Sequence, residues 1–193
     1  MTKNILICGV GGQGTVLAAK VLSQAAISGG QHVLSAETIG MAQRGGSVTS
    51  HVRIGDDIFS PLIPKGTADI IIAFEAAEAV RNISYLKKDG LVIVNKKIVQ
   101  PTTASLNNKT FSESEMIDYL EKTAGQVIAV DTDKACSDLH SSKVANMVLL
   151  GASCKTGLIS KDELKAAIKL LVKPAFYELN LKAVDYVQEK QKI

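Results

Sequence analysis

The sequence predicts an α/β protein with a mostly parallel sheet, an antiparallel β excursion and a helical C-terminal third. Three observations favour this fold class. Short apolar runs alternate with segments of helical periodicity as far as Asp131. Residues 47–54 alternate instead with period two, and the chain after Asp131 shows helical patterns throughout. Its 193 residues are enough for one ordinary domain, so residues 1–193 are expected to fold as a single unit.

The first 36 residues form a strand, a helix and a second strand in this prediction. Residues 5–8 are an apolar run that ends in glycines, as expected of a strand buried on both faces. From Thr15 apolar residues recur at helical spacing, and Gly29-Gly30 ends the helix. Residues 32–36 have the pattern of a strand. The unit therefore predicts a Rossmann-like start, with the two strands paired in parallel through a right-handed crossover.

The remaining elements are predicted from the spacing of apolar residues and from turn and capping residues. Residues 47–54 should be a strand whose solvated face carries Thr49, His51 and Arg53, followed by a turn at 55–57 and a short hairpin arm at 58–60. Strands are expected at 69–74, 91–94 and 127–130, helices at 75–86 and 112–122, a turn at 87–90, and loop or weak strand at 95–111. One long helix is expected at 135–153, another after the Ser160 cap, and a last one from Pro174.

Composition excludes several functional classes. The net charge is only +3 and no block of like charges occurs, so a nucleic-acid-binding arm is not expected. No apolar stretch is long enough to span a membrane, and no signal peptide precedes the first strand. The three cysteines have neither metal-site nor disulfide-framework spacing. A reduced, cytoplasmic setting is the expectation.

The first candidate site is the glycine-rich turn at residues 9–14, GVGGQG, which satisfies G-x-G-x-x-G between a strand and a helix. Free N–H groups at a helix N-terminus, together with the helix dipole, favour a phosphate or carboxylate. Glu37 lies where a dinucleotide enzyme would place a ribose-binding acid. The alternative is a glycine turn that only allows a sharp bend. The anion-accepting turn would comprise Gly9, Gly11, Gly12, Gln13, Gly14 and Thr15.

The second candidate site is the cluster at 41–47, MAQRGGS. An arginine beside two glycines can present a guanidinium and backbone N–H groups to an anion or to a partner's carboxylate. The alternative is a flexible loop with one solvated arginine. No nucleophile, acid or base occurs in a catalytic motif, so no catalytic or metal-binding residue is predicted.

The motifs together resemble a known family. The GVGGQG turn, the run GMAQRGGSVTSHVRIG at 40–55 and KVANMVLLGA at 143–152 are similar to gamma-type subunits of 2-oxoacid (pyruvate/ketoisovalerate):ferredoxin oxidoreductases. Within this family the resemblance is greatest to the beta subunits of the indolepyruvate type. It extends over essentially the whole chain, and it implies that residues 1–193 are one gamma-type domain.

The resemblance implies an assembled enzyme that oxidatively decarboxylates 2-oxo acids, here aryl pyruvates, to acyl-CoA and passes electrons to ferredoxin. This chain has no thiamine-binding GDG and no cluster-binding cysteines. Thiamine diphosphate and the [4Fe–4S] clusters are therefore expected on a large partner subunit, and the isolated chain should be inactive. The glycine turn would contact coenzyme A. Gln43, Arg44, Gly45, Gly46 and Ser47 would line the subunit interface.

Two other functional classes remain open from the sequence. A free-standing NAD(P)-dependent reductase would use Glu37 on the ribose. An interaction module would bind nothing at its glycine turn. The isolated chain is also expected to form a homodimer that mimics the missing partner.

Overall fold

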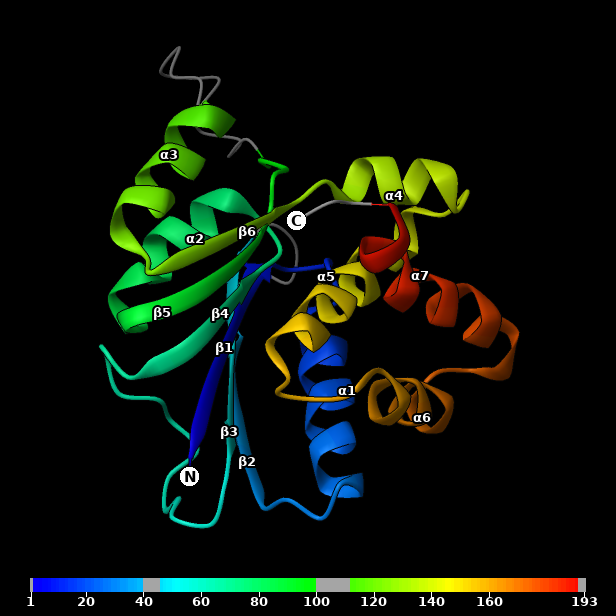
Figure 1. The fold of residues 1–193 in the computed structure, drawn as a ribbon, viewed down its shortest axis with the longest axis horizontal. Helices are drawn as coiled ribbons and strands as arrows, with labels where there is room; N and C mark the ends of the chain where they lie inside the picture. Colours follow the sequence, from blue (N-terminus) through cyan, green and yellow to red (C-terminus); the bar gives the residue numbers. More distant parts are fainter. Residues whose placement is uncertain (1, 40–45, 100–111, 191–193) are drawn as a thin grey trace.

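The computed structural model describes residues 2–39, 46–99 and 112–190. In these ranges six strands form one sheet in the order β2-β3-β1-β4-β5-β6, with helices on both faces (Figure 1). The strands are β1 (Lys3–Val10), β2 (Val33–Ile39), β3 (Ser47–Ile54), β4 (Ala68–Ala73), β5 (Leu86–Asn95) and β6 (Gln126–Val130). The predicted α/β class, with its antiparallel excursion and helical C-terminal third, is confirmed.

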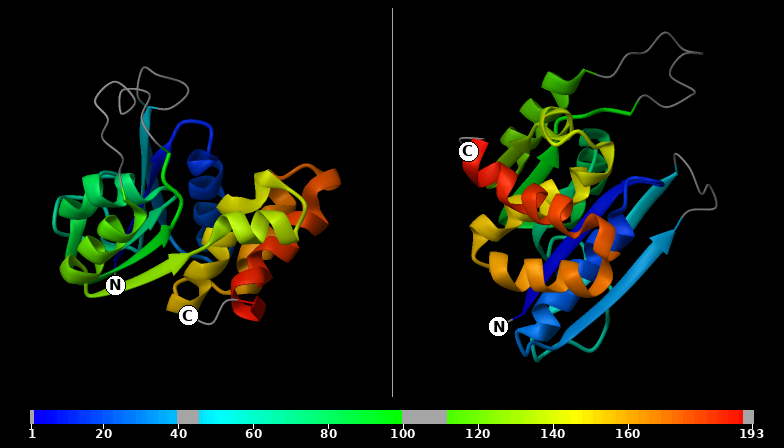
Figure 2. Two further views of the ribbon diagram at one scale, coloured as in Figure 1. Left: turned by 90° about the horizontal axis from the view of Figure 1, so that it is seen from above. Right: turned by 90° about the vertical axis from the view of Figure 1, so that its right-hand side faces the viewer.

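The α-helices divide between the two faces of the sheet. They are α1 (Thr15–Ser28), α2 (Ala76–Asn82), α3 (Glu113–Thr123), α4 (Thr132–Asp138), α5 (Ala145–Ser153), α6 (Lys161–Leu171) and α7 (Tyr177–Lys190). Helices α2 and α3 cover one face, and α1, α5, α6 and α7 lie on the other (Figures 1 and 2). Side chains of β1 alternate accordingly. Ile5 and Ile7 enter the core under α1 and α5, whereas Leu6 and Cys8 enter the core under α2.

The predicted parallel pairing of the first two strands is wrong. Strand β3 lies between β1 and β2 and is antiparallel to both, with His51 opposite Leu6 on one side and Ala36 on the other. Strands β1 and β2 still run in the same direction, because each is antiparallel to the same neighbour. The helix between them therefore crosses over one intervening strand. On its other side β1 pairs in parallel with β4, which is followed by β5 and β6.

The predicted solvated face of β3 is also wrong. His51 is buried, and its Nδ1 accepts a 3.1 Å hydrogen bond from the backbone N–H of Ile63. The Tyr85 ring meets the His51 ring edge-on, with the centroids 5.7 Å apart. This face is covered because residues 58–63 fold over it as irregular chain and do not form the expected hairpin arm. The Arg53 guanidinium fixes that segment by donating to the carbonyl of Ser60 at 2.8 Å.

One predicted turn and one predicted helix differ from the structure. The expected turn at 87–90 lies inside β5, where Asp89 has φ of 62° and the pairing with β4 shifts register. The expected long helix at 135–153 is broken. Its first part is α4, and His140 with φ of 51° precedes a short 3-10 turn, Ser142–Val144, that leads into α5. Both breaks use non-glycine residues in the left-handed region, which sequence patterns rarely reveal.

The helical layer on the α1 face is closely packed. Helix α5 contacts α7 so tightly that a Cβ on Gly151 would lie 2.2 Å from the carbonyl oxygen of Val184. The predicted Ser160 cap is confirmed as a complete capping box, in which Glu163 accepts from the Ser160 backbone N–H. Among the helices of the described ranges, none combines the length and the apolar character that crossing a membrane requires.

Candidate functional site

A cleft of about 480 Å³ opens at the carboxyl ends of the parallel strands. The chain leaves β1 toward α1 on one face of the sheet and leaves the adjacent β4 toward α2 on the other (Figure 1). Ligands of open α/β sheets bind in the crevice at such a switch point. The volume lies in the range of small-molecule pockets. The lining residues are Gly12, Gln13, Gly14, Phe74, Asn95, Lys97, Val99, Thr132, Asp133, Cys136, Ser142, Lys143, Ala145 and Asn146.

The glycine-rich turn forms one wall of this cleft. Gly12 and Gly14 have φ of 99° and 83°, which only glycine adopts without strain. Gln13 closes the turn, because its Oε1 accepts a 2.9 Å hydrogen bond from the Val10 N–H. Gly14 is the N-cap of α1 and supplies no side-chain acceptor. The first backbone N–H groups of α1 therefore lack intrahelical partners at a cleft-facing helix end, where the dipole favours negative charge.

The predicted turn residues have two different roles. Gly12, Gln13 and Gly14 line the cleft, whereas Gly9, Gly11 and Thr15 do not. A Cβ on Gly9 would lie 2.6 Å from Gln13 Oε1 and 2.9 Å from Phe74 Cβ, so this glycine permits close packing behind the turn. Thr15 is buried in the same place. Part of the motif thus lines the cleft, and the rest packs behind the lining residues.

Another part of the cleft wall carries polar side chains that the sequence patterns did not predict. Asn95 ends β5, donates to the Phe74 carbonyl at 3.1 Å and accepts from the Thr132 hydroxyl at 2.9 Å. Asn146 on α5 packs against Gly14, with its Nδ2 only 2.8 Å from the position of a Cβ there. Asn95 directly follows the apolar run at 91–94, and Thr132 lies two residues after the end of β6. A polar residue at the carboxyl end of a parallel strand is the signal that could have found them.

Two lysines give this wall its positive charge. Lys97 pairs with Asp133 at 2.7 Å, and both side chains remain substantially exposed. Lys143 is exposed at the cleft and makes no ion pair within the described ranges. The cleft therefore combines helix N–H groups, three carboxamides and two ammonium groups, one of which is paired with the Asp133 carboxylate. This donor set suits a phosphorylated or carboxylated ligand.

The second predicted cluster is described only in part. Gln43, Arg44 and Gly45 lie outside the described residues. The carbonyl of Gly46 accepts a 2.8 Å hydrogen bond from the Gly11 N–H, and the Ser47 hydroxyl donates to Glu78 Oε2 at 2.6 Å. The end of this cluster therefore lies directly against the glycine-rich turn, a proximity that the sequence did not predict.

Glu37 does not occupy the position of a ribose-binding acid. It lies within the edge strand β2, paired opposite Ser50, and is exposed. In a dinucleotide-binding unit the acid ends a strand adjacent to β1. Here β3 separates β2 from β1, so the ribose-recognition geometry of an NAD(P)-dependent reductase is not built.

The cysteines are dispersed and differ in environment. Cys8 is fully buried on the α2 side of the sheet, and burial, with the nearby Glu78 and Glu75 carboxylates, raises its thiol pKa strongly. Cys136 lines the cleft, and burial raises its pKa as well. No group of three or more His, Cys, Asp or Glu side chains in the described ranges could hold a metal ion.

Comparison with known proteins identifies the family of this chain. The family model described as pyruvate ferredoxin/flavodoxin oxidoreductase matches residues 4–189. The chain belongs to this oxidoreductase family. It is 40% identical over 186 residues to a protein named indolepyruvate oxidoreductase subunit IorB from Pyrococcus horikoshii, covering 94% of this chain and 92% of the relative.

Solved structures of oxidoreductase subunits have the same fold. The gamma subunit of a keto/oxoacid ferredoxin oxidoreductase from Geobacter sulfurreducens superposes with a TM-score of 0.69 at 28% identity, over 94% of each chain. A Magnetococcus marinus 2-oxoglutarate:ferredoxin oxidoreductase, solved with 2-oxoglutarate, coenzyme A and succinyl-CoA bound, superposes with a TM-score of 0.72 at 20% identity. That match covers 95% of this chain but 30% of the other chain, so the family fold also occurs as one segment of a longer polypeptide.

Proposed function

We propose that this chain is the small subunit of a ferredoxin-dependent 2-oxoacid oxidoreductase of the indolepyruvate type, and that its cleft holds part of coenzyme A. Family membership over residues 4–189 and the 40% identity to an IorB subunit support the first part. The glycine-rich helix N-terminus facing Lys97 and Lys143 across one cleft supports the second. The complete enzyme oxidatively decarboxylates an aryl pyruvate to an acyl-CoA.

The phosphates of coenzyme A fit the donor set of the cleft. The N–H groups at the start of α1 and the dipole of that helix offer a pyrophosphate seat beside Gly12 and Gly14. Lys143 supplies a counter-charge in the same cleft, and Lys97 adds a second ammonium group that is paired with Asp133. Coenzyme A supplies the thiol that takes up the acyl group, while this chain binds and orients the phosphorylated portion.

Thiamine diphosphate and the [4Fe–4S] clusters belong to the large partner subunit in this proposal. The cysteines of this chain do not fit a cluster, because Cys8 lies on one face of the sheet and Cys136 and Cys154 on the other. The sequence has no nucleophile, acid or base in a catalytic motif. The subunit therefore contributes to acyl acceptance and assembly, and cytoplasmic location is part of the same proposal.

The test is steady-state kinetics on the assembled complex. The chain is co-expressed with its large subunit, and indolepyruvate-dependent, coenzyme A-dependent reduction of ferredoxin is measured. Lys97→Ala combined with Lys143→Ala should raise KM for coenzyme A about tenfold or more and leave kcat and KM for indolepyruvate nearly unchanged, since uniform ligand binding is lost. Lys122→Ala on α3 is the matched control for removing a lysine elsewhere.

Each outcome separates the parts of the proposal. An unchanged KM for coenzyme A in the double variant refutes the ligand part. Saturable NADH binding to the purified chain without coenzyme A binding would favour a reductase. Aryl-pyruvate oxidation by the purified chain alone would show that the chemistry does not belong to the partner.

A further inference from the structure

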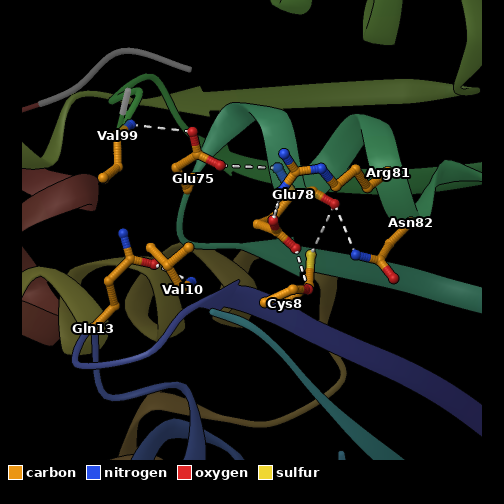
Figure 3. A network of polar contacts seen from close by, with 9 residues as sticks. Cys8, Val10, Gln13, Glu75, Glu78, Arg81, Asn82 and Val99 are labelled. Carbon is orange, nitrogen blue, oxygen red and sulfur yellow. Dashed lines mark hydrogen bonds and ion pairs between the residues drawn. The ribbon is translucent and has the colours of Figure 1, made fainter. Parts of the chain in front are cut away.

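Two buried carboxylates lie behind the glycine-rich turn, at the start of α2. Glu75 is 2% exposed and Glu78 is 0% exposed. Figure 3 shows Glu78 between α2 and β1, and Glu75 at the start of α2 with its carboxylate directed at Val99. Burying a carboxylate is costly unless hydrogen bonds and charge compensate it. Their contacts therefore indicate what the molecule gains from placing them there.

Glu78 holds the chain that enters β3. Its Oε2 accepts the Ser47 hydroxyl at 2.6 Å, and its other oxygen pairs with Arg81. Ser47 directly follows Gly46, whose carbonyl accepts from the Gly11 N–H at 2.8 Å. Glu78 thus fixes Ser47, and through the adjacent peptide it fixes the contact with the glycine-rich turn.

Glu75 holds the chain that leaves β5. Its Oε1 accepts the Val99 N–H at 3.1 Å, while Oε2 accepts the Glu78 N–H at 3.0 Å as the N-cap of α2. The Ala76 N–H donates to the Lys97 carbonyl at 3.2 Å. Lys97 and Val99 both line the cleft. The Glu75 side chain therefore has two roles: it caps α2, and it holds the backbone of the cleft-lining Val99.

We infer that Glu75 and Glu78 are positioning residues: Glu75 fixes the cleft-lining residues Lys97 and Val99, and Glu78 fixes residues 46–47 against the glycine-rich turn. The inference uses the proposed coenzyme A function only for its kinetic readout. A carboxylate is suited to this role at Glu75 because both oxygens accept, each from a different backbone N–H. A glutamine would direct an NH₂ group at one of those two donors.

Glu75→Asp separates the two purposes. Aspartate caps a helix as well as or better than other residues, so the bond to the Glu78 N–H is retained. The side chain is shorter by one methylene and does not reach the Val99 N–H. A merely structural cap would be unaffected by this change. A positioning residue would lose its hold on Val99.

The experiment is amide hydrogen exchange on the full chain, followed by NMR, together with the thermal midpoint. We expect Glu75→Asp to speed exchange at Val99 about tenfold or more, with the midpoint close to that of the wild type. Glu78→Ala and Ser47→Ala should each speed exchange at Gly11 and should not add when combined, because both remove the hydrogen bond between these two side chains. Ser160→Ala, which removes the cap of α6, should leave both amides unchanged.

Unchanged exchange at Val99 in Glu75→Asp, or at Gly11 in both Glu78→Ala and Ser47→Ala, would overturn the inference. In the assembled enzyme Glu75→Asp should raise KM for coenzyme A several-fold at constant kcat. Suppose that Glu75→Asp speeds exchange at Val99 and that the lysine double variant raises KM for coenzyme A. If Glu75→Asp then leaves this KM unchanged, the role of Glu75 in positioning the cleft wall is refuted. If neither variant raises it, the proposed coenzyme A function fails while the exchange result stands.

Discussion

The backbone N–H of Gly11 donates a 2.8 Å hydrogen bond to the carbonyl of Gly46. This bond continues the pairing of β1 with β3, in which Val10 lies opposite Ser47, and it helps to join the two motifs that are most distinctive in the sequence. Ser47, next in the chain, continues the connection to the buried Glu78 carboxylate. The glycine-rich turn and the end of the 41–47 cluster are therefore parts of one local structure, and changes in either are expected to affect the other.

Gly14→Ala is expected to destabilise the chain more than φ alone explains. The alanine would have to keep φ of 83°, and its Cβ would lie 2.8 Å from Asn146 Nδ2. Left-handed φ costs about 1–2 kcal/mol for a non-glycine residue, and the clash should add about 1 kcal/mol or more. Urea denaturation measures the loss. Gly30→Ala is the control, because it has φ of 78° with nothing within 4 Å of its Cβ.

Adding Asn146→Ala should recover the steric part of the Gly14→Ala loss. The pair would then show a favourable coupling free energy in a double-mutant cycle. Equal losses for Gly14→Ala and Gly30→Ala, with no coupling to Asn146, would contradict the close approach of α5 to the turn.

Gly151→Ala should be among the most damaging single substitutions in the helical layer. Its Cβ would lie 2.2 Å from the Val184 carbonyl oxygen, so α5 and α7 would have to separate. Overpacking of this kind costs about 3 kcal/mol, visible in the thermal midpoint. The neighbouring Ala152→Gly tests ordinary helix and packing effects and should cost about 1–2 kcal/mol. A Gly151→Ala chain as stable as the wild type would refute the tight packing.

Cys136 can report on cleft occupancy without any activity measurement. Burial raises its pKa above the ordinary 9.0, so little thiolate exists at neutral pH and iodoacetamide labelling should be slow and should accelerate with rising pH. Coenzyme A bound in the cleft should slow labelling further. Cys154, outside the cleft lining and with its pKa raised to about 11 by burial, is an internal reference. Equal effects of coenzyme A on both cysteines would count against binding in this cleft.

Asp185 links α6 to α7 and should make stability depend on pH in the acid range. Burial alone would raise its pKa, but hydrogen bonds from Lys165 at 2.7 Å and Lys161 at 3.2 Å hold the pKa below the ordinary 3.8. A depressed pKa stabilises the folded state above 3.8, and this contribution is lost as pH falls through the lower, folded-state value. Asp185→Asn should therefore remove about 0.5–1 kcal/mol at pH 7 in low salt.

The control for that measurement is Asp118→Asn on α3, because Asp118 is exposed and makes no ion pair in the described ranges. Urea denaturation at several pH values and salt concentrations compares the two variants. A loss for Asp185→Asn that is independent of salt, or that persists once the carboxylate of the wild type is protonated, would show that the ion pairs are not its cause.

Local features of this fold could be predicted from the sequence because their causes are local. The helix after Thr15 follows from the spacing of its apolar residues and from the glycines at its ends. The caps at Ser112 and Ser160 follow from residues three positions apart. The cleft-lining part of the glycine-rich turn was found for the same reason, since strand, turn and helix are contiguous.

The order of the strands could not be predicted because it is decided by distant residues. The pattern at 32–36 fits a strand next to β1 as well as it fits one separated by β3. His51 was assigned to solvent because nothing nearby in sequence indicates that Ile63 and Tyr85 would cover it. Asn146 was not predicted as a site residue for a related reason. Its contact with Gly14 depends on how α5 packs against the turn, which the sequence of that apolar helix does not indicate.

The position of β1 in the sheet has a consequence for biosynthesis. This strand is the first to be made, yet both of its neighbours, β3 and β4, lie further along the chain and flank it only once residue 73 has been synthesised. Until then Ile5, Leu6 and Ile7 form an apolar segment without its sheet partners on a nascent chain. Transiently exposed apolar segments and unpaired strand edges promote aggregation, and chaperones protect them. The centre of the finished sheet is thus the part that a ribosome leaves uncovered longest.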